Sequence, residues 1–186
     1  MCIMLAVFMG KVLKKKTAVA GDEVTYSLML RQMQKAAAIQ HKGIASRHAY
    51  SMDGIDYYCG IRDEDIGILR QKYDVIILDI SFENTFDNTN VTFARMVSRL
   101  SACDEKILAG SMLPWKSREC EKKMERIERF LDIRGLKMVT LAACDKEAVS
   151  MIKKHGVEVV LIPFERNPFV ISGENLRSFL ELLKIT

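Results

Sequence analysis

The sequence predicts an α/β protein with three layers, in which a mostly parallel sheet is flanked by helices. From Thr17 onward, short apolar segments alternate with longer segments of helical periodicity. Residues 75–78 (VIIL) form a continuous apolar run, which is typical of a strand covered on both faces. Strands that alternate with helices of this length favour βαβ units, and therefore parallel strand pairs.

The first half of the chain contains several expected elements. Residues 17–21 (TAVAG) are a strand, and residues 24–41 show helical periodicity. Two further strands, 43–51 and 55–59, flank the turn signal Met52-Asp53-Gly54. A helix is predicted over 63–72, because its first turn is acidic and its last turn is basic, as the helix dipole favours.

The second half continues the same alternation after the strand 75–78. A helix over 90–103 is followed by a strand over 106–109 that Gly110 ends, and then by a helix with the apolar face Cys120, Met124, Ile127 and Leu131. A strand over 137–142, a helix over 146–155 and a strand over 157–162 come next. The closing helix has Leu176, Phe179, Leu180 and Leu183 on one face.

The length of 186 residues fits a single α/β domain, 1–186. The composition, 49% hydrophobic and 28% charged, is ordinary for a soluble globular protein. The net charge of +4 is mild and comes largely from Lys11 and 14–16, so no nucleic-acid partner is expected. The five cysteines include no C-x-x-C pair, which favours a reducing, cytoplasmic location.

The opening segment MCIMLAVFMG is apolar over only about ten residues. It is too short to span a bilayer and lacks the preceding basic residue of a signal peptide. We therefore expect no transmembrane segment, and we interpret residues 1–16 as an edge strand or a flexible start.

Asp79 follows the apolar strand directly. A residue in this position lies at the carboxyl end of a strand, which is the edge of open α/β sheets where ligands bind. The sequence thus makes Asp79 the first candidate for chemistry.

The loop after the first strand reads AGDEVTYS, residues 20–27. A phosphate-binding P-loop needs G-x-x-x-x-G-K-[ST], because backbone N–H groups must surround the phosphates while a lysine and a hydroxyl contact phosphate and Mg²⁺. Gly21 and Thr25 stand at the two ends of a shorter loop that has no second glycine and no lysine. Asp22 and Glu23 add two negative charges, so the loop is poorly suited to phosphate.

Several stretches together resemble a known family. They are Thr25-Tyr26-Ser27 after the first strand, DGIDYYCGI (53–61), YDVIILDIS (73–81), ILAGSMLPWKSRE (107–119) and IPFERNPFVISGENL (162–176). This pattern looks like the divergent MinD/ParA-type P-loop proteins of Firmicutes, which are related to the Tad-pilus localisation ATPases of TadZ type. The resemblance runs from about Lys16 to the end of the chain.

The resemblance implies a P-loop NTPase fold of MinD/ParA type, whose intact members bind ATP with Mg²⁺ and dimerise. By matching position, Asp79 resembles the acidic residue of Walker B and Thr25 the metal-binding hydroxyl of Walker A, so both are candidate metal ligands. Gly21 resembles the first P-loop glycine. With Ser27 in the same loop, these residues are candidates for cofactor binding.

Pro114 and Trp115 complete the candidate cofactor-binding set. Trp115 is the only tryptophan and follows a strand within GSMLPW, one of the most specific parts of the resemblance. It could stack on a purine, anchor a partner, or pack the start of the next helix.

The departure from the family concerns lysine. No lysine directly precedes Thr25, and none stands early in the loop after the first strand, so the Walker A motif is degenerate. The function expected is therefore a non-catalytic cytosolic scaffold or localisation factor with protein partners. The resemblance implies a pilus or secretion apparatus as partner and a homodimer as the assembly.

Two alternatives remain open from the sequence. The first is a residual Mg²⁺-dependent ATPase that uses Asp79 and Thr25. The second is a receiver-like phospho-acceptor domain, in which Asp22, Glu23 and Asp79 hold Mg²⁺ and Ser111 supplies a hydroxyl.

Overall fold

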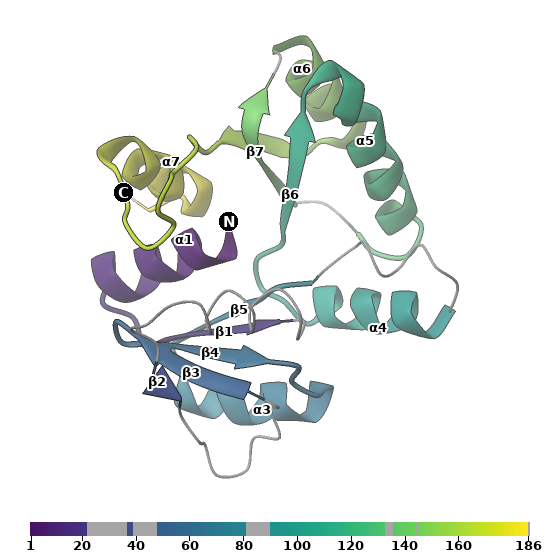
Figure 1. Ribbon diagram of the computed structural model, residues 1–186. Coiled ribbons are helices and arrows are strands. Elements are labelled where there is room, and N and C mark those ends of the chain that lie inside the picture. The colour runs from purple at the N-terminus through teal and green to yellow at the C-terminus, as the bar shows by residue number, and fades with distance from the viewer. Residues whose placement is uncertain (22–36, 39–47, 81–89, 133–135, 144, 186) are drawn as a thin grey trace. The chain divides into compact units, whose positions relative to one another are not determined.

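The computed structural model describes residues 1–21, 37–38, 48–80, 90–132, 136–143 and 145–185 (Figure 1). The chain divides into two compact units, one of residues 1–88 with 167–171 and one of residues 89–166 with 172–186. Among the described residues, no helix is long and apolar enough to cross a membrane.

The first unit contains a sheet with the strand order β2-β3-β4-β1-β5. Its strands are β1 (Thr17–Gly21), β2 (Ala37–Ala38), β3 (His48–Met52), β4 (Ile55–Cys59) and β5 (Val75–Leu78). β1 pairs in parallel with both β4 and β5, whereas β3 is antiparallel to its neighbours. β1 is buried along its whole length and lies between β4 and β5, and β5 lies at one end of this order.

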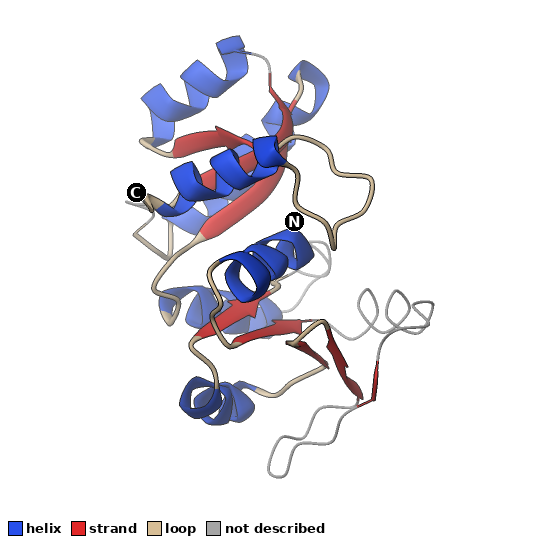
Figure 2. Ribbon diagram, turned by 90° about the vertical axis from the view of Figure 1, so that its left-hand side faces the viewer, coloured by secondary structure: helices blue, strands red, loops and turns tan. Residues whose placement is uncertain are grey.

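Helices cover both faces of this sheet (Figures 1 and 2). Ala18 and Ala20 of β1 pack in one core cluster with Leu69 of α3 (Asp63–Lys72). On the other face, Gly10 lies so close to β4 that a Cβ there would be 2.9 Å from Cγ1 of Ile55. The unit therefore has the three layers predicted, with the alternation of side chains along β1 directing them to opposite helices.

Residues 1–16 do not form the edge strand that was one of our two expectations, so that prediction is wrong. The segment begins with the α-helix α1 (Cys2–Val7) and the π-helix η1 (Phe8–Val12), where the N–H of Leu13 donates to the carbonyl of Phe8 at 3.1 Å. Side chains 3–8 are all buried. A run this short and apolar on all sides gives no periodicity with which to separate helix from strand.

The turn predicted at Asp53-Gly54 is confirmed and joins β3 to β4. Both residues have positive φ, 54° and 78°, as a two-residue hairpin turn of type I′ requires. Nζ of Lys11 lies 2.6 Å from a carboxylate oxygen of Asp53, so η1 is tied to the turn. The helix expected over 24–41 lies mostly outside the described residues, and at Ala37–Ala38 the chain is strand β2 instead.

The second unit contains a parallel sheet with the strand order β6-β7-β8. Its elements are α4 (Asn90–Ser101), β6 (Ile107–Met112), α5 (Pro114–Glu128), β7 (Lys137–Ala143), α6 (Asp145–His155), β8 (Glu158–Leu161) and α7 (Gly173–Leu183). Figure 1 shows α5 and α6 on one face of the sheet and α7 on the other. This is the arrangement that right-handed crossovers produce.

β6 continues past the residue at which we expected it to end. Gly110 remains in the strand, and the register shifts between Gly110 and Met112. A Cβ at Gly110 would lie 2.6 Å from Sγ of Cys120 and 2.8 Å from Cε of Met138. Glycine is needed here for close packing under α5, and it does not act as a strand breaker.

The remaining predicted elements are confirmed to within a few residues, and parallel pairs predominate in both sheets. The chain is therefore an α/β protein with mostly parallel strands flanked by helices.

Candidate functional site

The carboxyl edge of the first sheet brings the ends of three parallel strands to the same level. Ala20 pairs with Leu78, and Gly21 pairs with Cys59. Asp79 is the next residue after β5, and its N–H donates to the carbonyl of Ala20 at 2.8 Å. The prediction that Asp79 lies at the carboxyl end of this strand is therefore confirmed, and a ligand site at this edge stays a prediction.

Glycines form the rest of this edge. The N–H of Gly60 donates to the carbonyl of Gly21 at 2.9 Å, which extends the β1–β4 pairing by one residue. Gly60 has φ of 69°, a conformation that glycine adopts without the cost a side chain would add. Gly21 is buried and is the last residue of β1.

The predicted metal pair is only partly described. Asp79 is half-buried at the strand end, whereas Thr25 and Ser27 lie outside the described residues, as do Asp22 and Glu23. Within the described ranges, no three His, Cys, Asp or Glu side chains are placed to hold a metal ion. Metal binding by Asp79 and Thr25 therefore stays a prediction.

Pro114 and Trp115 begin helix α5 in the second unit. Pro114 occupies the first helical turn, where a missing N–H costs nothing. Trp115 is 75% exposed, so the interpretation that it packs the start of the helix is wrong. The indole is a solvent-exposed aromatic surface.

Ser111 follows Gly110 at the register shift of β6. Its Oγ accepts a hydrogen bond of 3.4 Å from the N–H of Leu113, and its carbonyl accepts one of 3.5 Å from the Cys120 thiol. These contacts stabilise the turn from β6 into α5, which is a structural role.

The PFERNPF and GENL segments meet at the start of α7. Nδ2 of Asn175 donates to a carboxylate oxygen of Glu165 at 3.0 Å, and the N–H of Asn175 donates to Oγ of Ser172 at 3.3 Å. Hydrogen bonds from Asn175 and then Ser172 lower the pKa of Glu165. Ser172 is thus the N-cap of α7, and these motif residues fix the helix to the loop before it.

A buried hydrogen-bond chain in the first unit was not predicted. The hydroxyl of Tyr73 donates to Asp56 at 2.5 Å and lies 2.7 Å from the hydroxyl of Tyr58. Burial and then the hydrogen bond to Asp56 raise the pKa of Tyr73. No spacing rule could have found it, because the three residues come together only through the packing of α3 on β4.

A hollow of about 430 Å³ lies at the amino ends of β6, β7 and β8. Ion pairs line it, Lys137 with Glu105 at 2.9 Å and Lys184 with Glu158 at 3.2 Å. Because four of its charged side chains form these two ion pairs, we assign it no ligand.

Comparisons with known proteins identify the fold. No protein-family model matches the chain, and no curated protein matches it in sequence. Among solved structures, the MinD cell division protein of Aquifex aeolicus is similar with a TM-score of 0.65, over 100% of this chain and 92% of that one, at 11% identity. The chain has the MinD fold. MinD in the MinC:MinD complex of the same organism gives a TM-score of 0.64 at 11% identity, over 99% of this chain and 91% of that one.

The MinD likeness supports the fold class predicted from the sequence, an α/β fold of MinD type with mostly parallel strands flanked by helices. At this sequence identity, the likeness concerns the fold alone.

Proposed function

We propose that this MinD-like chain is a non-catalytic scaffold or localisation factor of the cytoplasm that acts through a protein partner. The loop after β1 carries the proposal. It departs from Gly21, at the edge where the fold places ligands, and supplies Asp22 and Glu23 but no lysine. Phosphates bound by this loop would lie near two carboxylates of the loop, which contains no lysine. This arrangement opposes the binding of a nucleoside triphosphate.

The fold supports a single functional body. The likeness to MinD spans the whole chain, so both compact units correspond to parts of one similar protein. We therefore propose one domain over residues 1–186, with a degenerate Walker A loop.

The nature of the partner follows from two lines of support. A similar MinD has been solved in a complex with MinC, which shows that a protein of this fold binds another protein. The TadZ-like motifs support a pilus or secretion apparatus as the partner here, and a homodimer as the assembly. Sedimentation of the purified chain tests the dimer, and recovery of apparatus components with the tagged wild type, but not with Trp115→Ala, tests the partner.

The nucleotide part of the proposal is tested by calorimetric titration of ATP with Mg²⁺ into the purified chain. We expect no saturable heat from the wild type or from Asp79→Ala. Saturable binding that Asp79→Ala removes would contradict the proposal.

A gain-of-function variant makes the negative result informative. Val24→Lys places a lysine directly before Thr25, where the family has one. If the missing lysine is the principal defect, this variant acquires ATP binding that the wild type lacks.

A residual Mg²⁺-dependent ATPase is the second candidate. The position of Asp79, half-buried and level with Gly21, favours it, because this is where a strand-end carboxylate could face Mg²⁺. Such an enzyme would need a lysine from elsewhere in the chain or from a partner. The receiver-like alternative gains no support, because the likeness over the whole chain is to MinD.

A further inference from the structure

We propose that the outer surface of α5 and α6 binds an acidic, amphipathic segment of a protein partner. We define this α5–α6 surface by Trp115, Arg118 and Lys122 of α5 and by Lys146, Val149 and Lys153 of α6. The inference rests on the proposed scaffold function and names the chemistry of its partner. It stands on how the two helices distribute their charges.

Three of the four acidic residues of α5 contact basic side chains of α6. Nζ of Lys154 lies 2.6 Å from Glu121 and 2.9 Å from Glu125, and Nδ1 of His155 lies 2.7 Å from Glu128. The hydrogen bonds that Lys154 donates to Glu121 and then Glu125 raise the pKa of Lys154, which favours its charged form at this seam between the helices. The carboxylates of Glu121 and Glu125 therefore form ion pairs with Lys154, and that of Glu128 lies within hydrogen-bond distance of His155.

The outer faces keep their cations. Trp115, Arg118 and Lys122 follow one another at i, i+3 and i+7, so they form one stripe along α5. Lys146, Val149 and Lys153 have the same spacing on α6, and all six side chains are exposed. Within the described part of the chain, none of the four basic side chains pairs with a carboxylate.

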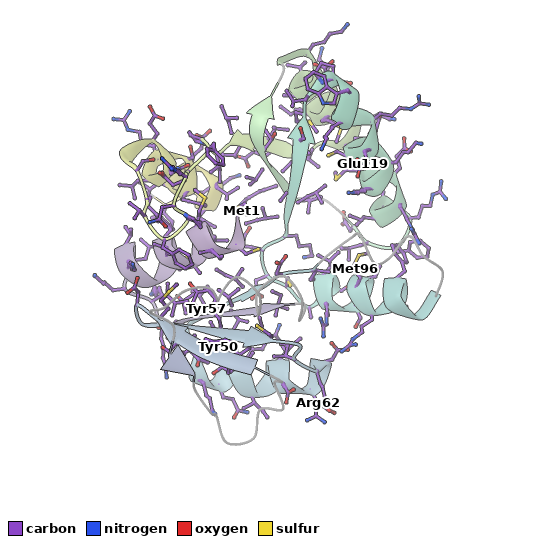
Figure 3. The ribbon with its side chains drawn as sticks, in the orientation of Figure 1. Met1, Tyr50, Tyr57, Arg62, Met96 and Glu119 are labelled. Carbon is purple, nitrogen blue, oxygen red and sulfur yellow. The ribbon has the colours of Figure 1, made fainter. Side chains whose placement is uncertain are left out.

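The fourth acidic residue of α5 is also paired, whereas Glu147 of α6 has one carboxylate oxygen buried away from solvent. Glu119 lies on α5 (Figure 3), and one of its carboxylate oxygens is 2.8 Å from Nζ of Lys123. Its hydrogen bond to Lys123 lowers its pKa. It therefore leaves the positive charge of the neighbouring stripe uncompensated.

Two exposed apolar side chains stand among these cations. Trp115 is 75% exposed and Val149 is 46% exposed. Trp115 lies in the first turn of α5 and Val149 in the second turn of α6, and these helices begin at the carboxyl ends of the neighbouring strands β6 and β7. A tryptophan surrounded by basic side chains is the kind of anchor that dominates protein interfaces, with the charges selecting an acidic partner.

The charge distribution favours a peptide over an anionic membrane. Glu121 and Glu125, 32% and 44% exposed, lie between the cations of α5 and those of α6. A continuous layer of lipid phosphates would press against these carboxylates. A helical segment, in contrast, can place single carboxylates opposite single cations and its apolar face on Trp115.

The test uses a synthetic amphipathic peptide of about twenty residues, long enough for a stable helix, with leucines on one face and glutamates on the other. A twin with lysine in place of glutamate is the control. Because the chain has one tryptophan, its fluorescence reports directly on Trp115. We expect saturable binding of the acidic peptide with a changed tryptophan emission, weaker binding at high salt, and none of these with the twin.

Variants locate the site. Labelled-peptide anisotropy should show at least about tenfold weaker binding for the double variant Lys122→Glu with Lys146→Glu, because each reversal replaces attraction to the glutamates of the peptide with repulsion. The matched control is Lys15→Glu with Arg177→Glu. It reverses two exposed charges, one just before β1 and one on α7, and should bind the peptide as the wild type does. Circular dichroism melts confirm that both variants fold.

Other outcomes would overturn the inference. These are equal binding of the acidic peptide and its twin, no binding of either, or binding that the double variant leaves unchanged. Vesicles rich in phosphatidylserine that bind the wild type but not the double variant, without peptide binding, would assign the surface to membranes. Self-association lost in that variant would assign it to a second copy. The peptide-binding assay contains no nucleotide. A finding that the chain binds ATP would therefore contradict the proposed function without changing the result for the acidic peptide.

Discussion

The backbone N–H of Asp79 donates a 2.8 Å hydrogen bond to the carbonyl of Ala20, which fixes the end of β5 to β1 beside the start of the loop at Gly21. The main chain thus holds the strand-end carboxylate of this fold in place. Its side chain contributes little to that arrangement, so position and chemistry can be tested separately.

We predict that Asp79→Ala changes the free energy of unfolding by less than about 0.5 kcal/mol, as is usual away from buried contacts. The matched comparison is Asp65→Ala. Asp65 is buried and accepts a 3.0 Å hydrogen bond from the N–H of Arg62 at the start of α3, so its loss should cost about 1–2 kcal/mol. Urea denaturation measures both. Equal losses would mean that Asp79 has a structural role.

Gly110→Ala should destabilise the chain by about 1–3 kcal/mol, because the added methyl group would overlap Cys120 and Met138 under α5. Gly67→Ala is the control, since a Cβ there meets nothing within 4 Å in helix α3. That change should stabilise by about 0.5–1 kcal/mol. A neutral Gly110→Ala would show that β6 and α5 are less tightly packed than described.

Tyr73→Phe should cost about 1.5–3 kcal/mol, because it removes the donor to the Asp56 carboxylate and the contact with Tyr58. Tyr58→Phe removes only the bond between the two hydroxyls and should cost about 0.5–1.5 kcal/mol. Denaturant melts of the two variants give the order directly. The reverse order would place the stronger bond between the tyrosines.

The same tyrosines predict sensitivity to alkali. Burial raises the pKa of Tyr57, Tyr58 and Tyr73 above the ordinary value of 10. A folded-state pKa above the unfolded one gives stability that is complete below the unfolded pKa and is lost as the pH rises through the folded pKa. Stability should therefore fall as the pH rises above 10, and less steeply in Tyr73→Phe. Identical pH profiles would contradict this assignment.

Local sequence signals predicted most of the fold. The acidic and basic ends of 63–72, the VIIL run and the Asp53-Gly54 turn each act over a few residues, and each was found where predicted. The N-terminal helix and the end of β6 were not predicted. The conformation of a segment that is apolar on all sides, and the effect of a glycine within a strand, both depend on the residues that pack against them.

The candidate site divides in the same way. The position of Asp79 at the carboxyl end of a strand was predicted from the direction of the chain through that strand alone. The sequence predicts the apolar face of α5 but gives no partner for its charged residues, and in the structure Glu121, Glu125 and Glu128 contact α6. Only the neighbouring helix reveals that arrangement, and with it the uncompensated cations beside Trp115.

The most direct test of the account is thermal unfolding of the chain with and without ATP and Mg²⁺. A ligand present at about 100 times its Kd adds about 2.7 kcal/mol of stability, which raises the Tm by several degrees. The account predicts no shift for the wild type at millimolar ATP. A shift of several degrees that Asp79→Ala abolishes would contradict it and identify a nucleotide-binding protein.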